Sequence, residues 1–342
     1  MRRLALLPLL VLIVVQAASA AKAPTSWAQP QIKVVTAHGL MGGDPQPATF
    51  RPDDPLTQGD LADLVAGLTE QPLVTPANPA APVTITQLDA KLVNGLGLTA
   101  AAAGFARAER AAGLRPPSRF GAEVVARLLG LRTNHPAAQD ALELRPNDVA
   151  TRAEAAFSAE RILQLSGREQ DALTEEAATF EPPALTQWQT KILQTAVGLI
   201  GFPYIWGGES DVPTTAASPF GLQVQGGFDC SGFVWRVYKL QPYAGAPQLA
   251  QALRGRTTMA MSGEVPKAQR IAALDLQPAD VLFFGAHGPR SKPAEIDHAA
   301  IYLGNGWLIQ SSAYGVALAP FDGWYARRFA WARRPLAEAR LV

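Results

Sequence analysis

The residue with the most reactive side chain in this sequence is Cys230, the only cysteine of the chain. It follows Gly226-Gly227-Phe228-Asp229 and opens a run from Ser231 to Tyr238 whose apolar residues recur at helical spacing. A cysteine in the first turn of a helix lies near unpaired backbone N–H groups and the positive end of the helix dipole, which favour the thiolate. The pattern indicates a cysteine nucleophile. The competing interpretation is a small, buried, unreactive side chain.

Two further residues would complete this chemistry. His298 and Gln310 lie in apolar runs on either side of Gly304-Asn305-Gly306, a pattern that predicts a β-hairpin. In this hairpin the two side chains fall on one face, two positions apart across the strands. His298 would take the thiol proton as the base, and the uncharged Gln310 would orient the imidazole by accepting its Nδ1–H. A single strand histidine is also typical of a structural core position.

Four short motifs occur in one order: Pro203-Tyr204-x-Trp206-Gly207-Gly208, Asp229-Cys230-Ser231-Gly232-Phe233-Val234, Leu276-x-Pro278-Ala279-Asp280-Val281-Leu282-Phe283-Phe284 and His298-Ala299-Ala300-Ile301-Tyr302-Leu303-Gly304. Together they resemble the NlpC-type cell-wall peptidases, which are papain-like cysteine enzymes, over about Trp188 to Arg333. The resemblance implies an α+β domain in which N-terminal helices pack on an antiparallel sheet. It also implies a nucleophile at Cys230, a general base and acid at His298, and a third polar residue at Gln310.

The same resemblance implies roles for residues beside the nucleophile. Tyr204 would support the oxyanion region, and Trp206 would contact the substrate. Asp229 and Ser231 would bind the free amine of the substrate, although Asp229 also fits the N-cap of the helix. The insert 209–227 lengthens the usual spacing between Tyr204 and Cys230, so it would either form the rim of the cleft or displace the tyrosine. His287 is a spare candidate base without a hairpin partner.

The first half of the chain contains an internal repeat. Phe50-Arg51-Pro52-Asp53-Asp54-Pro55-Leu56-Thr57 leads into a predicted helix, and Leu144 to Glu154 repeats this plan ninety-four residues later, with a weaker third copy at Val83 to Asp89. Thr151-Arg152-Ala153-Glu154 resembles the Thr-Arg-Ala-Glu motif of S-layer homology repeats, which dock secreted proteins onto wall polymers. The resemblance implies polymer binding by Arg152, an arginine that the first copy lacks. A helical spacer without a ligand is the alternative.

Composition and the N-terminal residues indicate where the protein acts and which ligands it lacks. Met1-Arg2-Arg3, an apolar run to Val15 and an Ala-x-Ala exit near Ala20 predict a signal peptide, with an uncleaved anchor as the alternative. The net charge of +1 gives no basic field that would attract nucleic acid. No residues show metal-ligand spacing, so we expect no metal and no cofactor.

The sequence therefore predicts four parts: a signal peptide (1–20), all-α helix–loop–helix repeats (21–166), a linker (167–184) and an NlpC-type cysteine peptidase domain (185–342). The predicted function is a secreted peptidoglycan endopeptidase that hydrolyses stem peptides, at a γ-D-glutamyl–diaminopimelate-type bond, and is tethered to the wall by the repeats. Two alternatives stay open: a non-catalytic wall-binding or S-layer-associated protein, and an amidase or transpeptidase on the same fold.

Overall fold

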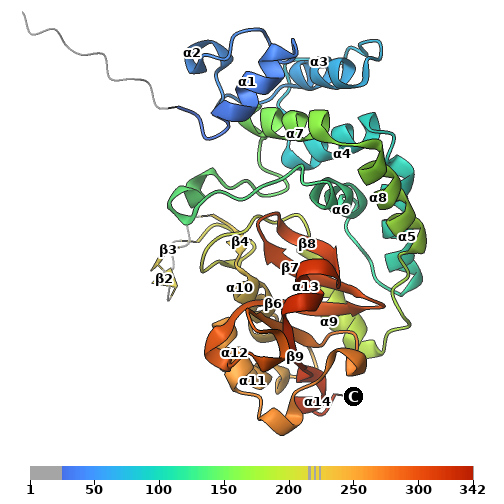
Figure 1. Cartoon of the computed structure of the whole chain (residues 1–342), viewed down its shortest axis with the longest axis vertical. Coiled ribbons are helices and arrows are strands. Elements are labelled where there is room, and N and C mark those ends of the chain that lie inside the picture. The colour runs from blue at the N-terminus through green and yellow to red at the C-terminus, as the bar shows by residue number, and fades with distance from the viewer. Residues whose placement is uncertain (1–24, 215–216, 219–220, 223–224, 342) are drawn as a thin grey trace, which may run out of the picture.

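The computed structural model describes residues 25–214, 217–218, 221–222 and 225–341. The predicted signal peptide lies outside these residues. A helical part leads into an α+β part, as the sequence predicts (Figure 1). The helical part contains α1 (Gln29–Ala37), α2 (Pro47–Phe50), α3 (Gln58–Thr69), α4 (Ile85–Gly95), α5 (Thr99–Ala111), α6 (Phe120–Leu128), a 3₁₀ turn (Ala137–Leu142), α7 (Arg152–Gln164) and α8 (Gly167–Thr179).

Three copies of the repeat close into a ring of backbone hydrogen bonds. The N–H of Leu56 donates to the carbonyl of Ala150 at 2.8 Å, Ala150 donates to Val83 at 2.8 Å, and Val83 donates to Leu56 at 2.9 Å. Each of these three residues is buried and directly precedes the threonine that caps α3, α4 or α7. The weak middle copy is therefore a complete member of the ring, and the repeat has approximate three-fold symmetry.

The caps of the three helices differ in detail. Thr57 and Thr84 form reciprocal capping boxes with the third residue of their helices, Asp60 and Gln87. Thr151 accepts the N–H of Glu154, but the Glu154 carboxylate is paired with Arg132 at 3.0 Å instead. The third copy, whose sequence matches the capping box best, thus uses its acidic residue for packing between helices.

The segment predicted as a linker is largely a helix. Residues 167–179 form α8, which starts with a capping box between Ser166 and Glu169 and packs along α5. Leu173 and Ala177 are buried. Of the paired acidic residues in this helix, Glu175 is exposed and Glu176 is half-buried, as on the polar side of an amphipathic helix.

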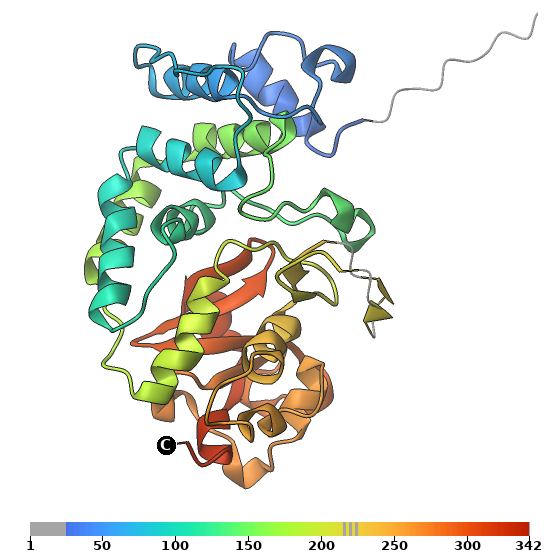
Figure 2. The same cartoon turned by 180° about the vertical axis from the view of Figure 1, so that it is seen from behind.

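The α+β part is built on one antiparallel sheet of five strands in the order β8-β7-β6-β5-β9. Its strands are β5 (Val281–Gly285), β6 (Ile296–Gly304), β7 (Trp307–Ser312), β8 (Gly315–Pro320) and β9 (Phe329–Arg333). Its helices are α9 (Gln187–Gly198), α10 (Cys230–Trp235), α11 (Leu249–Ala252), α12 (Thr258–Gly263), α13 (Gly323–Arg328) and α14 (Pro335–Glu338). Seen from behind, the yellow-green α9 lies against the sheet (Figure 2).

The predicted hairpin is confirmed with a shorter turn. Strands β6 and β7 pair antiparallel and are joined by Asn305 and Gly306, which both have positive φ angles of 46° and 79°. This Asn-Gly loop has the backbone twist that two-residue hairpins require. The register places Gln310 opposite Ala300, and therefore on the face of His298.

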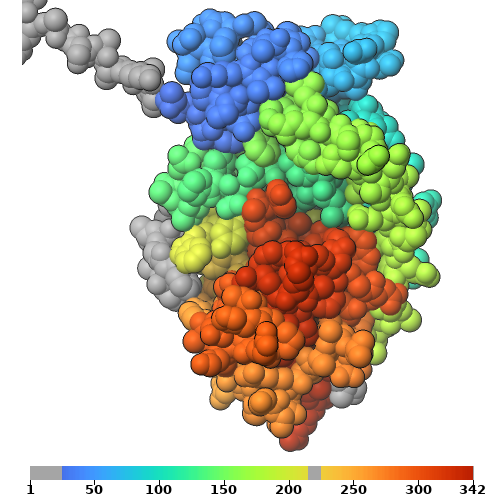
Figure 3. Space-filling model, in the orientation of Figure 1, coloured from blue at the N-terminus to red at the C-terminus, as the bar shows by residue number. Residues whose placement is uncertain are grey.

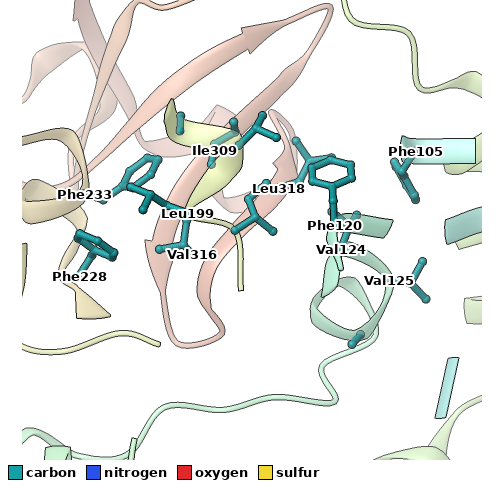
Figure 4. Packing of buried hydrophobic residues seen from close by; sticks show 14 of the residues in the cluster. Phe105, Phe120, Val124, Val125, Leu199, Phe228, Phe233, Ile309, Val316 and Leu318 are labelled. Atoms are coloured by element: carbon teal, nitrogen blue, oxygen red, sulfur yellow. The ribbon is translucent and has the colours of Figure 1, made fainter. Parts of the chain in front are cut away.

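One hydrophobic core runs through both parts of the chain. It includes Phe105, Phe120 and Val124 of the helical part together with Leu199, Val316 and Leu318 of the sheet part. Figure 4 shows Phe120 and Val124 facing Leu318. In the space-filling view the green helical segments rest directly on the red strands (Figure 3).

Candidate active site

Cys230 occupies the first residue of α10, as its sequence context predicts. Asp229 is the N-cap and accepts the N–H of Gly232. The thiol is 9% exposed and contacts the carbonyl oxygen of Asp297 at 3.9 Å, and the backbone N–H groups of Ala299 and Ser231 donate to it. Cys230 is thus held against the two peptide groups that flank His298.

The strand pairing explains how the thiol reaches this position. Strand β7 pairs with β6 only from Ala300 onward, so the backbone of β6 just before this residue is not covered by β7. Ser311 of β7 donates to the carbonyl of Phe228, two residues before the cysteine. The start of α10 therefore lies beside His298, where β7 no longer covers β6 and where Ser311 binds the segment just before the cysteine.

The nucleophile and the base are both uncharged in this arrangement. Burial, and after it the Asp229 carboxylate, raise the pKa of Cys230 to about 12, although backbone N–H donors and Arg256 act in the opposite direction. Burial lowers the pKa of His298 to about 4, with Asp297 opposing this change and Arg328 adding to it. At neutral pH the site holds a thiol and a neutral imidazole.

The imidazole of His298 packs among aromatic rings. Its centroid lies 5.6 Å from Phe284, 5.7 Å from Trp324 and 6.0 Å from Tyr325. His298 Nε2 and Gln310 Oε1 are buried atoms without hydrogen-bond partners. Among the described residues, no hydrogen bond joins Cys230, His298 and Gln310. The structure brings the three residues together, and a nitrogen of His298 and an oxygen of Gln310 are left without hydrogen-bond partners.

Arg256 is a site residue that the sequence analysis missed. Its guanidinium donates to Asp229 Oδ1 at 3.1 Å and to Ser231 Oγ at 2.8 Å, and its Nε donates to Glu209 at 2.6 Å. It also donates to the carbonyls of Gly207 and Gly208. One partly buried arginine therefore joins the loop that contains Tyr204 (202–208, the tyrosine loop) to both neighbours of Cys230. Arg256 lies twenty-six residues after the cysteine, so no local sequence pattern linked the two residues.

This arrangement changes the interpretation of Asp229 and Ser231. Asp229 accepts hydrogen bonds from Gly207, Gly232, Ser231 and Arg256, and Ser231 is held between Asp229 and Arg256. The proposed binding of a substrate amine by these two residues gains no support from these contacts, because their acceptor atoms are already engaged. The N-cap alternative for Asp229 accounts for its position.

Tyr204 stays next to the nucleophile despite the long insert. The two ends of the insert are held together where β1 (Glu209–Ser210) pairs antiparallel with β4 (Gly227–Phe228). Burial raises the pKa of Tyr204, and the nearby Cys230 raises it further. Trp206 is 58% exposed in the same loop, and its backbone N–H donates to Asp140 of the helical part.

Two other candidates have structural partners elsewhere. Arg152 donates to the carbonyls of Phe50 and Met41 and to Asp60 at 3.1 Å, and its guanidinium lies over the Phe50 ring. Its role in polymer binding is therefore unsupported, since it joins the third repeat to the first. His287 is exposed and pairs with Glu295 at 3.4 Å, outside the site.

Within the described ranges no group of three or more His, Cys, Asp and Glu side chains is placed to hold a metal ion. No helix in the described part of the chain combines the length and apolar character needed to cross a bilayer.

Comparisons with known proteins agree with the motifs. Residues 201–334 match the model of the NlpC/P60 family, and residues 21–62 match that of the S-layer homology domain. A probable endopeptidase of Mycobacterium tuberculosis is 37% identical over 128 residues, which are 37% of this chain and 24% of that protein. The murein DD-endopeptidase MepH of Escherichia coli is 30% identical over 162 residues, covering 46% of this chain and 50% of that protein.

A solved NlpC/P60 family structure from Bacillus cereus is similar at 26% identity and a TM-score of 0.32, over 45% of this chain and 41% of that one. The chain spans about a quarter of the length of the first curated relatives that it matches. The chain therefore carries an NlpC/P60 domain at residues 201–334, preceded by an S-layer homology segment at residues 21–62.

Proposed function

We propose that the protein is a peptidoglycan endopeptidase that cuts stem peptides with Cys230 as nucleophile. The observation that carries this proposal is the seating of the thiol, at a helix start, against the peptide groups on both sides of His298. The match of residues 201–334 to the NlpC/P60 model supports the same conclusion.

The proposed reaction starts from the neutral pair. His298 takes the thiol proton as the sulfur attacks the scissile carbonyl, and the developing oxyanion is stabilised by the backbone N–H of Cys230 with support from Tyr204. His298 then gives the proton to the leaving amine and a thioester remains. Water, deprotonated by His298, releases the acid and restores the thiol. Gln310 acts by orienting the imidazolium through its carbonyl oxygen.

The bond is proposed to be of the γ-D-glutamyl–diaminopimelate type. The curated relatives are named for different bonds, since one is a γ-D-glutamyl-L-lysine dipeptidyl-peptidase and another a murein DD-endopeptidase. We further propose a secreted, wall-associated location, with the repeats holding the enzyme near its substrate. This part rests on the S-layer homology match and the predicted signal peptide, and not on Arg152.

A second function is favoured by two features of the site. The neutral thiol and the missing hydrogen bond between Cys230 and His298 are also what a non-catalytic, wall-binding domain would show. An amidase or transpeptidase would use the same residues. Product analysis on defined muropeptides distinguishes the endopeptidase, the binding protein and the amidase or transpeptidase.

The test compares wild type with Cys230→Ala on purified peptidoglycan and defined muropeptides, with product masses as the readout. We expect hydrolysed stem peptides from wild type and a loss of at least about 1000-fold in the variant, because the nucleophile is gone. Cys230→Ser is the matched control for packing. Wall binding without cleavage by wild type would establish the binding protein, and amine-exchanged products would establish a transferase.

A further inference from the structure

A short helix, α13, packs against His298 and brings a charged side chain close to it. The indole of Trp324 meets the imidazole edge-on, with the two ring centroids 5.7 Å apart, and the ring of Tyr325 lies 6.0 Å away. The guanidinium of Arg328, at the end of the same helix, lies 4.8 Å from the centroid of the Trp324 ring. Arg328 is thus linked to the imidazole through one aromatic ring.

An ion pair joins this helix to the strand that carries His298. The Arg328 guanidinium donates to the carboxylate of Asp297, the residue directly before His298 on β6. The backbone carbonyl of Asp297 in turn contacts Sγ of Cys230 at 3.9 Å. Asp297 therefore lies next to both the nucleophile and the base, and its charge partner comes from α13.

The position of this ion pair makes it a weak contributor to stability. The side chain of Asp297 is 58% exposed and that of Arg328 is 23% exposed, and ion pairs that are so exposed add little to the free energy of unfolding. His298 is buried, by contrast, so solvent screens nearby charges less effectively at the imidazole. We therefore expect the pair to act on the proton affinity of His298 more than on the stability of the fold.

The other groups around the imidazole are uncharged at neutral pH. They are the Cys230 thiol of α10, Gln310 of β7, Phe284 of β5, and Trp324 and Tyr325 of α13. Burial raises the pKa of Tyr325 to about 12, and α12, which also packs on β6, has no charged side chain. Among the described residues, the charges that act on the pKa of His298 are those of Asp297, which raises it, and Arg328, which lowers it.

We propose that Asp297 and Arg328 are positioning residues with opposed charges, which together set how readily His298 accepts the proton of the Cys230 thiol. This inference rests on the proposed function, because it gives the pair a part in the thiol chemistry. Arg328 disfavours the imidazolium and so keeps the free enzyme in its neutral form. Asp297 limits this effect, so that the proton can still be transferred when the sulfur attacks. Neither residue exchanges a proton itself.

The experiment measures the protonation of His298 directly. The ring signals of the four histidines of the full-length protein are followed by NMR from about pH 3 to about pH 8, and His298→Gln identifies the signal of His298. We expect Arg328→Gln to move the midpoint of this titration upward by about half a pH unit or more, because a neighbouring cation disfavours the imidazolium. Asp297→Asn should move the midpoint downward, because an anion favours the imidazolium.

Two further variants separate charge from packing. Arg328→Lys keeps the cation and should restore most of the wild-type midpoint. Arg327→Gln changes an exposed residue of the same helix and should leave the midpoint unchanged. Circular dichroism at each pH shows whether each variant is folded.

A purely structural ion pair would give a different result. If the pair only held α13 in place, removing either member would let water reach the imidazole, and both variants would shift the midpoint upward, toward the ordinary pKa of histidine. Upward shifts in both variants, or no shift in either, would therefore overturn the inference.

Cleavage assays connect the titration to the reaction. The acid limb of the pH dependence of kcat/KM on defined muropeptides should move in the same direction as the NMR midpoint in each variant. An acid limb that stays in place in both variants would also overturn the inference. Opposed NMR shifts in a protein that cleaves no muropeptide would reject the proposed function, whereas cleavage with both shifts in one direction would reject only the role of the pair.

Discussion

At the scale of single residues, the site is a neutral pair that is short of hydrogen bonds. Cys230 and His298 are buried, and burial is the largest cause of both pKa shifts. His298 Nε2 and Gln310 Oε1 are buried and have no hydrogen-bond partner among the described residues. Many active sites align their catalytic hydrogen bonds only when substrate is bound. The free enzyme should therefore contain a thiol rather than a thiolate–imidazolium pair.

Alkylation of the single cysteine tests this directly. Because the pKa of Cys230 is raised to about 12 and that of His298 lowered to about 4, the thiolate fraction is small at neutral pH and grows as pH rises. We expect the rate of iodoacetamide modification, measured by mass, to increase steadily from about pH 6 to about pH 10, with Cys230→Ala giving the background. A rapid rate that is already constant across mildly acidic and neutral pH would show a preformed ion pair instead.

At the scale of elements, the start of α10 depends on close backbone approach. A Cβ on Gly232 would overlap the carbonyl oxygen of Gly208 and crowd Arg256. The glycine therefore lets the tyrosine loop and the nucleophile helix touch, and lets one guanidinium bridge them.

Gly232→Ala should consequently abolish activity and lower stability, because backbone atoms cannot move aside as a side chain can. Gly198→Ala is the matched control: it lies in α9, its added Cβ would meet no atom within 4 Å, and its φ is not positive. We expect the control to keep full activity and to change the free energy of unfolding by less than about 1 kcal/mol. Denaturant unfolding and the muropeptide assay provide the measurements, and an active Gly232→Ala would contradict the role of this contact.

The same scale shows what the sequence could and could not predict. The hairpin with His298 and Gln310, and the helix that begins at Cys230, follow from periodicity and glycine turns, which are local signals. Arg256 and the edge strands β8 and β9 were not predicted. Their roles depend on contacts between distant residues, such as the pairing of Phe283 with Trp331. The segment assigned as a linker (167–184) contains helix α8, which was not predicted because acidic composition alone does not distinguish a solvated helix face from a loop.

At the scale of the whole molecule, the helical and sheet parts depend on each other. Arg127 donates to the carbonyl of Gly201 at 2.7 Å, and Arg119 donates to that of Gly198 at 2.7 Å, so two guanidiniums hold the end of α9. The aromatic rings of Phe105, Phe180 and Trp307 pack together across the junction. The two family matches thus lie in one packed body.

Calorimetry should therefore show one unfolding transition for the folded chain. Phe120→Ala leaves a cavity at a fully buried site of the junction. It should lower the temperature of this single transition and reduce the free energy of unfolding by about 3–5 kcal/mol. Leu163→Ala, an exposed position on α7, serves as the control and should shift it little. Two separate transitions, of which Phe120→Ala moves only one, would mean that the parts fold independently.

The ring of repeats also constrains the order in which the chain can fold. The N–H of Leu56 needs the carbonyl of Ala150, and the carbonyl of Asp54 accepts the N–H of Arg152, so the first copy lacks these two partners until the third copy has been synthesised. Bringing such distant residues together is slow compared with forming the hairpin of β6 and β7. During synthesis, the N-terminal copies must therefore wait for residues nearly one hundred positions later before the ring can close.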